Sequence, residues 1–398
     1  MADPIKKITL KDGTTRYRFV VDIGLDANGK RKQLTVTKDT KKEAVAELSR
    51  IRHQRSVGSF VAPNKVTVDE LLDMWLKTAT RDVEEGTESN YDNAIRPVRR
   101  HMGHRRIQEL TEDDIEALID WMVTAGRVRG GTAGTGLGIR SVRLAVGRFR
   151  AALNLAVRRQ LVVRNVAEHV TVSRDAKKAT EGKSKPVPWD EAEVKAFLDG
   201  IKGHRLYAAM MLALIAERPA EVCGARWEED VDLDGTDTIA IGNTRTLVYD
   251  RTREKGEQLK VVEKDPKSES GRRVLPLPAP VAKALRSFHA LQAAEKLAAG
   301  DGYENSGYVL VDELGRPFKT DKLRRETHKL MELAGVRKVR LYDARHACLS
   351  WMANNGVPDT VVSAWAGHSD LSFTKRTYVH PEAKSLKAGA EKLNELLG

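Results

Sequence analysis

Apolar and polar residues alternate in three short runs near the start of the chain, at positions 7–13, 17–23 and 33–37. A period of two is typical of strands that bury one face. Asp-Gly and Asn-Gly pairs stand between the runs as turn signals. The pattern predicts a three-stranded antiparallel sheet. A helix is expected next, from about Thr40 to Arg55, and its apolar face should hold Ala44, Val45, Leu48 and Ile51.

The charge of the N-terminal segment suggests what this small sheet binds. Residues 1–62 hold 14 Lys and Arg against 7 Asp and Glu, a net charge of +7. Such a surface is either a solvated basic face or a module whose strands enter a DNA groove. The rest of the chain favours the second interpretation. The side chains expected to contact DNA are Arg16, Arg18, Lys30, Arg31 and Lys32.

The pattern becomes helical after a linker at residues 58–64. One helix should begin at Thr67 and bury its apolar face, and a second should follow Thr87. A third should start at Thr111, where Thr-Glu-Asp-Asp resembles a capping box. A fourth is predicted for 138–159, with apolar residues at helical spacing. Residues 66–170 therefore form a predicted all-helical domain.

The most unusual stretch of this domain runs from Gly126 to Arg164. It contains nine arginines and no Asp or Glu. Like charges one helical turn apart repel each other, so a segment of one sign is best tolerated where phosphates neutralise it. We expect DNA contacts from this segment, by Arg140, Arg143, Arg148 and Arg150.

Residues 171–188 are polar and basic, contain two prolines, and read as a linker between domains. Residues 189–398 combine predicted helices with strands near 238–241, 258–262 and 273–277. The longest apolar run, at 206–216, has 11 residues, and a bilayer-spanning helix needs about 18. Two cysteines exclude a disulfide framework. With no apolar leader at the N-terminus, these features predict a cytoplasmic protein.

Candidate chemistry is concentrated in this last segment. Arg218 directly follows an apolar helix, and Glu221 stands three residues later, which suggests a guanidinium held by a buried carboxylate. Lys267 falls in a turn between two predicted strands. Arg345 begins another helix, next to His346. A Gly-His pair ending at His368 precedes Tyr378 by ten residues.

In this order, these residues resemble the signature of the tyrosine recombinase (phage integrase) family. The signature is an Arg with a nearby acid, a Lys on a β-turn, a His-x-x-Arg box, a Gly-His pair and a Tyr in a Tyr-x-His context. The resemblance implies a multidomain α+β fold. It comprises an arm-type DNA-binding domain (1–62, a three-stranded sheet plus helix), a helical core-binding domain (66–170), the linker, and a mainly helical catalytic domain with a small antiparallel sheet (189–398).

The resemblance also implies roles for single residues. Tyr378 would attack phosphorus and form a 3′-phosphotyrosine, and Arg218, Arg345 and His368 would stabilise the charge on the phosphate oxygens. Lys267 would protonate the leaving 5′-oxygen, with Lys264 as the alternative acid. Glu221 and His346 would support them. No metal or cofactor is expected.

The sequence departs from the family pattern at Tyr342, which occupies the His position of the His-x-x-Arg box. A tyrosine hydroxyl can donate a hydrogen bond to a phosphate oxygen, but it is a poor base at neutral pH. Any proton transfer that the family assigns to this position is therefore in doubt here.

The partners implied by the resemblance are double-stranded DNA with core-type and arm-type sites, and further copies of the chain. A C-terminal apolar stripe after Pro381 would link a homotetramer. A directionality factor and a host DNA-bending protein would be accessory partners. The predicted function is integration and excision of a phage or mobile element genome. The alternatives are a recombinase that resolves chromosome dimers and a DNA-binding regulator that has lost catalysis.

Overall fold

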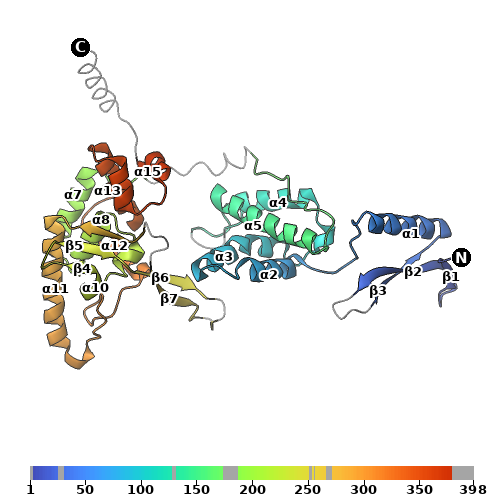
Figure 1. The fold of residues 1–398 in the computed structure, drawn as a ribbon, viewed down its shortest axis with the longest axis horizontal. Helices are drawn as coiled ribbons and strands as arrows, with labels where there is room; N and C mark the ends of the chain where they lie inside the picture. The colour runs from blue at the N-terminus through green and yellow to red at the C-terminus, as the bar shows by residue number, and fades with distance from the viewer. Residues whose placement is uncertain are drawn as a thin grey trace, which may run out of the picture. The chain divides into compact units, whose positions relative to one another are not determined.

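The computed structural model describes residues 3–25, 31–127, 131–173, 187–250, 253–254, 256–265 and 271–378. The chain divides into two compact units, Met1–Lys183 (unit 1) and Ser184–Gly398 (unit 2). Helices dominate both units and the sheets are small and antiparallel (Figure 1), which confirms the predicted α+β fold class. No helix within the described ranges is long and apolar enough to cross a membrane.

The N-terminal sheet of unit 1 has the predicted three antiparallel strands, in the order β1 (Lys6–Thr9), β2 (Thr15–Leu25) and β3 (Arg31–Lys38). One face of β2 packs through Phe19 and Val21 on helix α1 (Lys41–Ser56). Thr40 caps α1 and forms a capping box with Glu43. The sheet thus buries one face and leaves the other to solvent.

Three of the four residues predicted for the apolar face of α1 are buried, namely Ala44, Leu48 and Ile51. The prediction for Val45 was wrong, because its side chain is 47% exposed. A residue one position after Ala44 is turned by about 100° around the helix axis. Val45 therefore cannot share the narrow face that meets the sheet.

The rest of unit 1 is helical and has its own hydrophobic core. Its elements are α2 (Val68–Ala79), α3 (Glu85–Met102), η1 (Ile107–Glu109), α4 (Glu112–Thr124) and α5 (Ile139–Arg158). Thr67 and Thr111 each close a capping box, which confirms both predicted helix starts. Phe149, near the middle of α5, is fully buried, as are other apolar residues of its inward face.

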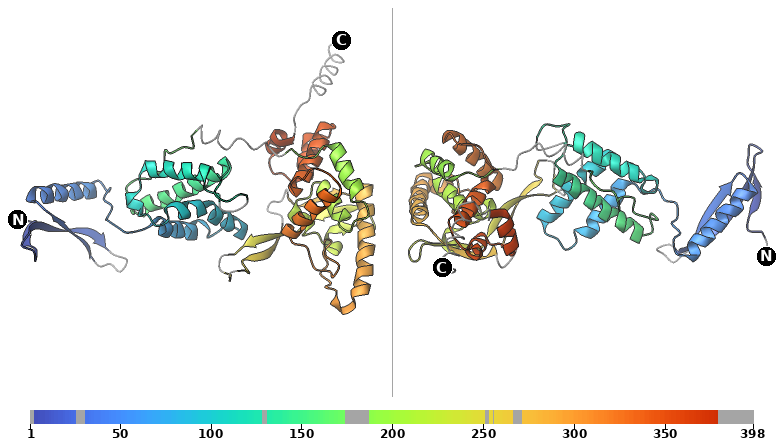
Figure 2. Two further views of the ribbon diagram at one scale, coloured as in Figure 1. Left: turned by 180° about the vertical axis from the view of Figure 1, so that it is seen from behind. Right: turned by 90° about the horizontal axis from the view of Figure 1, so that it is seen from above.

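Unit 2 contains a larger hydrophobic core and the following helices. They are α7 (Glu191–Gly200), α8 (Tyr207–Leu214), α9 (Pro219–Val222), α10 (Trp227–Asp230), α11 (Ala279–Ala299), η3 (Gly300–Gly302), α12 (Thr320–Leu333), α13 (Leu341–Asn354), α14 (Asp359–Ala366) and α15 (Leu371–Tyr378). The long helix α11 forms one side of this unit (Figures 1 and 2).

The strands of unit 2 form two separate antiparallel groups. One is a sheet in the order β4 (Val231–Asp232), β5 (Thr238–Ile241) and β8 (Arg273–Pro276), and the other is a hairpin of β6 (Thr244–Tyr249) and β7 (Leu259–Lys264). The hairpin projects from the unit (Figure 2). Strand β6 was not predicted. Only Val248 of this strand is buried, so β6 lacks the alternation of buried and exposed positions that is typical of a strand with one buried face.

One further expectation about unit 2 needs correction. The apolar run at 206–216 does not form one helix, because α8 ends at Leu214. Ala216 instead has φ of +77°, a conformation that non-glycine residues rarely adopt. This turn separates α8 from Arg218.

Candidate active site

The contact expected from the Arg-x-x-Glu spacing is present. Arg218 precedes α9, and its backbone N–H donates to Glu221 Oε2 at 2.8 Å while its guanidinium pairs with Oε1. Glu221 is only 2% exposed. Pro219 at the first position of α9 starts the helix without needing a backbone donor. The short helix thus fixes the carboxylate one turn away from the arginine.

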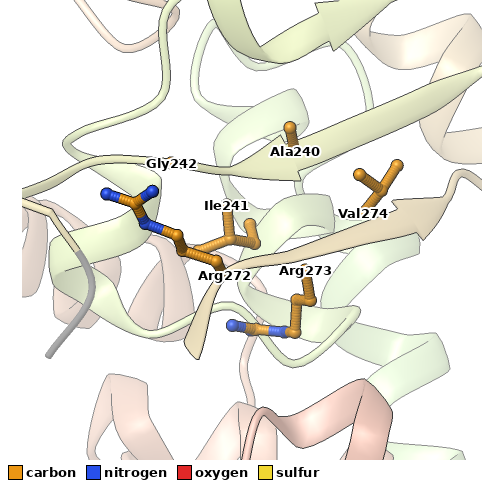
Figure 3. A pocket seen from close by; sticks show the side chains of 6 residues that line it. All are labelled: Ala240, Ile241, Gly242, Arg272, Arg273 and Val274. Atoms are coloured by element: carbon orange, nitrogen blue, oxygen red, sulfur yellow. The ribbon is translucent and has the colours of Figure 1, made fainter. Parts of the chain in front are cut away.

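A second arginine, which the sequence analysis did not identify, binds the same carboxylate. Arg273 on β8 donates to Glu221 Oε2 at 3.0 Å and to Oε1 at 3.3 Å, and its Nε donates to the Trp365 carbonyl at 2.7 Å. The side chains of Arg272 and Arg273 leave the backbone on opposite sides (Figure 3). Arg273 points inward, and Arg272 is exposed and pairs with Asp265.

Burial and the two arginines act in opposite directions on Glu221. Burial alone would raise its pKa, but the hydrogen bonds and positive charges of Arg273 and Arg218 outweigh burial and lower it. The carboxylate is therefore ionised at neutral pH. Conversely, burial favours the neutral form of Arg218, and Glu221 more than compensates, so that the pKa of Arg218 is raised.

Arg345 is fully buried on α13. Its Nη1 donates to the carbonyl of Ala216, in the positive-φ turn, and its Nη2 donates to the carbonyl of Ala366 at the end of α14. Arg218 Nη2 donates to the same Ala366 carbonyl at 3.3 Å and to the Gly367 carbonyl at 3.4 Å. The two arginines that the sequence analysis selected, 127 residues apart, thus converge on the C-terminal end of one helix.

His368 lies directly beside this pair. Gly367 ends α14 in the left-handed conformation, with φ of +63°, and turns the chain so that His368 Nε2 is 3.3 Å from Arg345 Nη2. Its Nδ1 is 2.8 Å from Thr374 Oγ1. Burial, followed by the charges of Arg345, Arg218 and Arg273, lowers the pKa of His368 to about 4. The imidazole is therefore neutral at physiological pH.

Tyr342, on the first turn of α13, belongs to the same cluster, because its hydroxyl contributes to the electrostatic environment of both Arg218 and Arg345. Its ring is 39% exposed and meets His346 edge-on, with ring centroids 5.2 Å apart. Burial lowers the pKa of His346. The ring contact packs His346 against Tyr342, one turn earlier on α13.

Lys267 and Tyr378 complete the predicted catalytic set. Lys267 lies outside the described residues. Tyr378 is the last residue of α15, and its side chain is outside the description, but α15 packs on α13 and α14. The helix that carries the predicted nucleophile is therefore attached to the elements that hold Arg345 and His368. Lys264, the alternative acid, ends β7, and its carbonyl accepts a hydrogen bond from Thr244.

The arginines predicted to bind DNA through α5 fall into two groups. Arg140 and Arg143 are exposed. Arg148 lies over the ring of Tyr91, at 3.9 Å from its centroid. Arg150 donates to the carbonyls of Ala167 and Val170, each at 2.8 Å, and so ties the end of the helical region to α5. The first pair is better placed for phosphate contacts than Arg150.

The basic residues predicted on the N-terminal sheet are described in part. Arg18 and Arg31 are exposed, with Arg18 Nε 3.3 Å from Thr37 Oγ1 on the neighbouring strand. Arg16 pairs with Asp39. Lys30 and the side chain of Lys32 lie outside the description.

The site also contains an acidic residue that the sequence analysis did not identify. Glu217, between Ala216 and Arg218, is 1% exposed, and neither carboxylate oxygen has a hydrogen-bond partner. Burial, and next the charge of Glu221, raise its pKa well above the usual value. Its position directly after the apolar run at 206–216 was only a weak signal of burial. Among the described residues, no group of three or more His, Cys, Asp or Glu side chains is arranged to hold a metal ion.

Comparison with known proteins identifies relatives of the whole chain. Residues 189–385 match the phage integrase family. A tyrosine recombinase XerC-like protein of Caldanaerobacter subterraneus subsp. tengcongensis is 26% identical over 97% of this chain and 98% of its own length. An integrase of Streptomyces ambofaciens is 25% identical over 94% of this chain and 92% of its own length.

Solved structures share the fold. The Tn1549 transposon integrase in complex with circular intermediate DNA has a TM-score of 0.63 and 19% identity, covering 82% of this chain and 100% of that chain. The lambda integrase tetramer bound to a Holliday junction has a TM-score of 0.53 and 15% identity, covering 93% of this chain and 97% of that chain. The chain belongs to the phage integrase family of tyrosine recombinases and is a site-specific DNA recombinase.

Proposed function

We propose that this recombinase integrates and excises the genome of a phage or related mobile element, through a 3′-phosphotyrosine formed by Tyr378. The observation that carries the proposal is the convergence of Arg218, Arg345 and His368 at the end of α14, next to the helix that bears Tyr378. The similarity to the integrases of Streptomyces ambofaciens and Tn1549 supports the mobile element.

The arginine pair suits the transition state of phosphoryl transfer. In-line attack increases negative charge on the non-bridging oxygens, and a guanidinium offers planar donors whose charge is permanent. Arg218 and Arg345 already bind backbone carbonyls, and Arg218 also binds Glu221. Their geometry is therefore set before DNA arrives, and little reorganisation is needed during the reaction.

The reaction conserves the energy of the phosphodiester bond. The Tyr378 oxygen attacks phosphorus, a bond from tyrosine to the 3′-phosphate forms, and the bond from phosphorus to the 5′-oxygen breaks. The leaving oxygen takes a proton from Lys267. The 5′-hydroxyl of a partner strand then reverses the step and releases Tyr378, so that rejoining requires no ATP.

Unit 1 would position the DNA. Arg140 and Arg143 are exposed on α5 in a segment without acidic residues, and Arg18 is exposed on the uncovered face of the N-terminal sheet. We assign core-type sites to the first surface and arm-type sites to the second. Such phosphate contacts set register and affinity rather than the chemistry.

Strand exchange needs two duplexes and therefore several protomers, and we propose a homotetramer on DNA. A directionality factor and a host DNA-bending protein would select integration or excision. A second candidate function, resolution of chromosome dimers, is favoured by the similarity to the XerC-like recombinase.

A nicked suicide duplex tests the proposal, because loss of the short fragment beyond the nick traps the covalent intermediate. The duplex carries the boundary sequence of the element that encodes the chain. We expect the wild type to form a protein–DNA adduct, and Tyr378→Phe to bind the duplex without forming one. No adduct from the wild type would indicate a regulator. An adduct only on a chromosomal dimer-resolution site would favour the second function.

A further inference from the structure

Thr374 is buried on α15 and contacts the imidazole of the active site. Its side chain is 0% exposed, and its hydroxyl is 2.8 Å from His368 Nδ1. The other ring nitrogen, Nε2, is 3.3 Å from Arg345 Nη2. Both nitrogens of His368 are thus engaged, one by a helix that carries the nucleophile and the other by an arginine of the phosphate site.

The partners determine which nitrogen holds the proton. A guanidinium has donors only, so a hydrogen bond between Arg345 and His368 requires Nε2 to accept. A neutral imidazole then carries its proton on Nδ1, which donates to the Thr374 hydroxyl. The opposite arrangement, with Thr374 donating to Nδ1, would aim an N–H group at a donor-only cation. A doubly protonated ring would add a second positive charge next to Arg345.

We propose that Thr374 is a positioning residue: its hydroxyl fixes His368 in the Nδ1–H tautomer, and His368 in turn orients the guanidinium of Arg345. Nη2 of Arg345 is then held by two acceptors, the Ala366 carbonyl and His368 Nε2. Before DNA binds, His368 therefore accepts a hydrogen bond from the arginine and does not present an N–H group to a phosphate.

The location of Thr374 gives this contact a second consequence. Positions 374 and 378 are four residues apart on α15 and lie on the same side of the helix, one turn from each other. The hydrogen bond to His368 consequently links the seating of α15 to the geometry of the arginine site. The docking of α15 and the orientation of Arg345 therefore both depend on this hydrogen bond. This inference rests on the proposed roles of Tyr378 and Arg345.

Three variants separate this role from ordinary packing. Thr374→Val has nearly the same shape and removes the hydroxyl, and Thr374→Ser keeps it. Thr327→Val is the matched control, because Thr327 is also a buried helical threonine, 1% exposed, whose hydroxyl donates to the Leu323 carbonyl. All three full-length proteins are compared with the wild type.

The first readout is the ¹⁵N NMR spectrum of histidine-labelled protein without DNA, with the His368 signals assigned through His368→Asn. We expect a protonated Nδ1 and an unprotonated Nε2 in the wild type, Thr374→Ser and Thr327→Val, and a mixture of tautomers or the reverse one in Thr374→Val. A wild type with the proton on Nε2, or a Thr374→Val spectrum identical to that of the wild type, would overturn the proposal.

The second readout is single-turnover cleavage of the nicked duplex. We expect Thr374→Val to cleave at least about tenfold more slowly at unchanged DNA affinity, with Thr374→Ser and Thr327→Val within about threefold of the wild type. A failure of Thr374→Ser to restore the rate would assign Thr374 to packing alone. A wild type that forms no adduct would instead refute the proposed function, and the spectra would still decide the tautomer.

Discussion

The arginines of units 1 and 2 differ in what surrounds them. Arg140 and Arg143 of α5 are exposed and belong to a stretch with no acidic residue. Arg345 is buried, and the side chain of Arg273 is only 7% exposed. The guanidiniums of both are already bound to carbonyls, with Arg273 also bound to Glu221. The first arrangement leaves positive charge available to any phosphate, and the second fixes the direction of every donor.

This difference separates two uses of the same side chain. An exposed guanidinium binds DNA by displacing counterions, so that its contribution depends on salt and little on geometry. A buried guanidinium has already lost its hydration and is held by fixed partners. Its value lies in stabilising the charge that develops in the transition state. Substitution of the exposed arginines should therefore weaken DNA binding, and substitution of the buried arginines should slow cleavage.

Loss of Arg345 should have the largest effect. Arg345→Ala removes a donor to the Ala216 carbonyl and one of the two arginine donors to the Ala366 carbonyl, and it leaves a cavity. These losses should lower the free energy of unfolding by about 3 kcal/mol or more. Cleavage should fall by at least about 10²- to 10³-fold. Urea titration and single-turnover cleavage measure the two effects.

The control for Arg345 is Arg325→Ala on α12, which breaks an exposed ion pair with Asp321. Arg325→Ala should lower the free energy of unfolding by less than about 1 kcal/mol. Equal losses of stability in the two variants would contradict the contrast between buried and exposed arginines.

Loss of the general acid should rank next and should depend on the leaving group. Lys267→Ala is expected to slow cleavage by about 10²-fold. A duplex with sulfur in place of the 5′-bridging oxygen should restore the rate, because a thiolate leaves without protonation. Lys264→Ala should affect neither substrate. If only the Lys264 variant is rescued by sulfur, the acid is Lys264.

The buried carboxyl group of Glu217 should make the free energy of unfolding depend on pH. Burial raises its pKa in the folded state, so the native protein holds a proton that the unfolded chain releases above the ordinary carboxyl value. Wild-type stability should therefore fall as the pH rises from about 5 towards the raised pKa, by about 1.4 kcal/mol per pH unit. Glu217→Gln lacks this titration.

The measurement is urea unfolding of the wild type and Glu217→Gln at pH 5, 6, 7 and 8. The advantage of the variant should widen with pH. Glu228→Gln, at an exposed position of α10, corrects for the loss of one carboxyl charge. A constant gap between the wild type and Glu217→Gln would show that Glu217 does not carry a native-state proton.

The smallest effects should come from the exposed arginines. Arg140→Ala and Arg143→Ala should each weaken DNA binding by about fivefold to tenfold and reduce the salt slope by about one. Cleavage at saturating protein should be unchanged. Lys329→Ala, which removes an exposed charge paired with Glu326 on α12, is the control. A loss of cleavage at saturation would place these arginines in the chemistry.

Local signals in the sequence predicted the fold well. Thr67 and Thr111 marked helix starts because capping boxes need only neighbouring residues. The contact between Arg218 and Glu221 was foreseeable for the same reason, since one helical turn separates them. The prediction for Val45 was wrong because consecutive residues of a helix lie about 100° apart around its axis, so Val45 cannot share the face of Ala44.

Contacts between distant residues were beyond local reasoning. Arg273, on the edge strand β8 of the β4-β5-β8 sheet, binds Glu221 from 52 positions away. The bond between His368 and Thr374 depends on the turn at Gly367, which no apolar pattern indicates. The motif order selected Arg345 correctly for the cluster, but its complete burial required the packing of α13 against α8 and α14.

The central claim is that a preorganised guanidinium neutralises charge on the scissile phosphate. Arg218→Ala tests it most directly, because Glu221 retains Arg273 as a partner. The measurement is single-turnover cleavage of two duplexes, one with a normal scissile phosphate and one with an uncharged methylphosphonate there. The account predicts that Arg218→Ala cleaves the methylphosphonate at least about tenfold faster than the phosphate. Equally poor cleavage of both duplexes would contradict it.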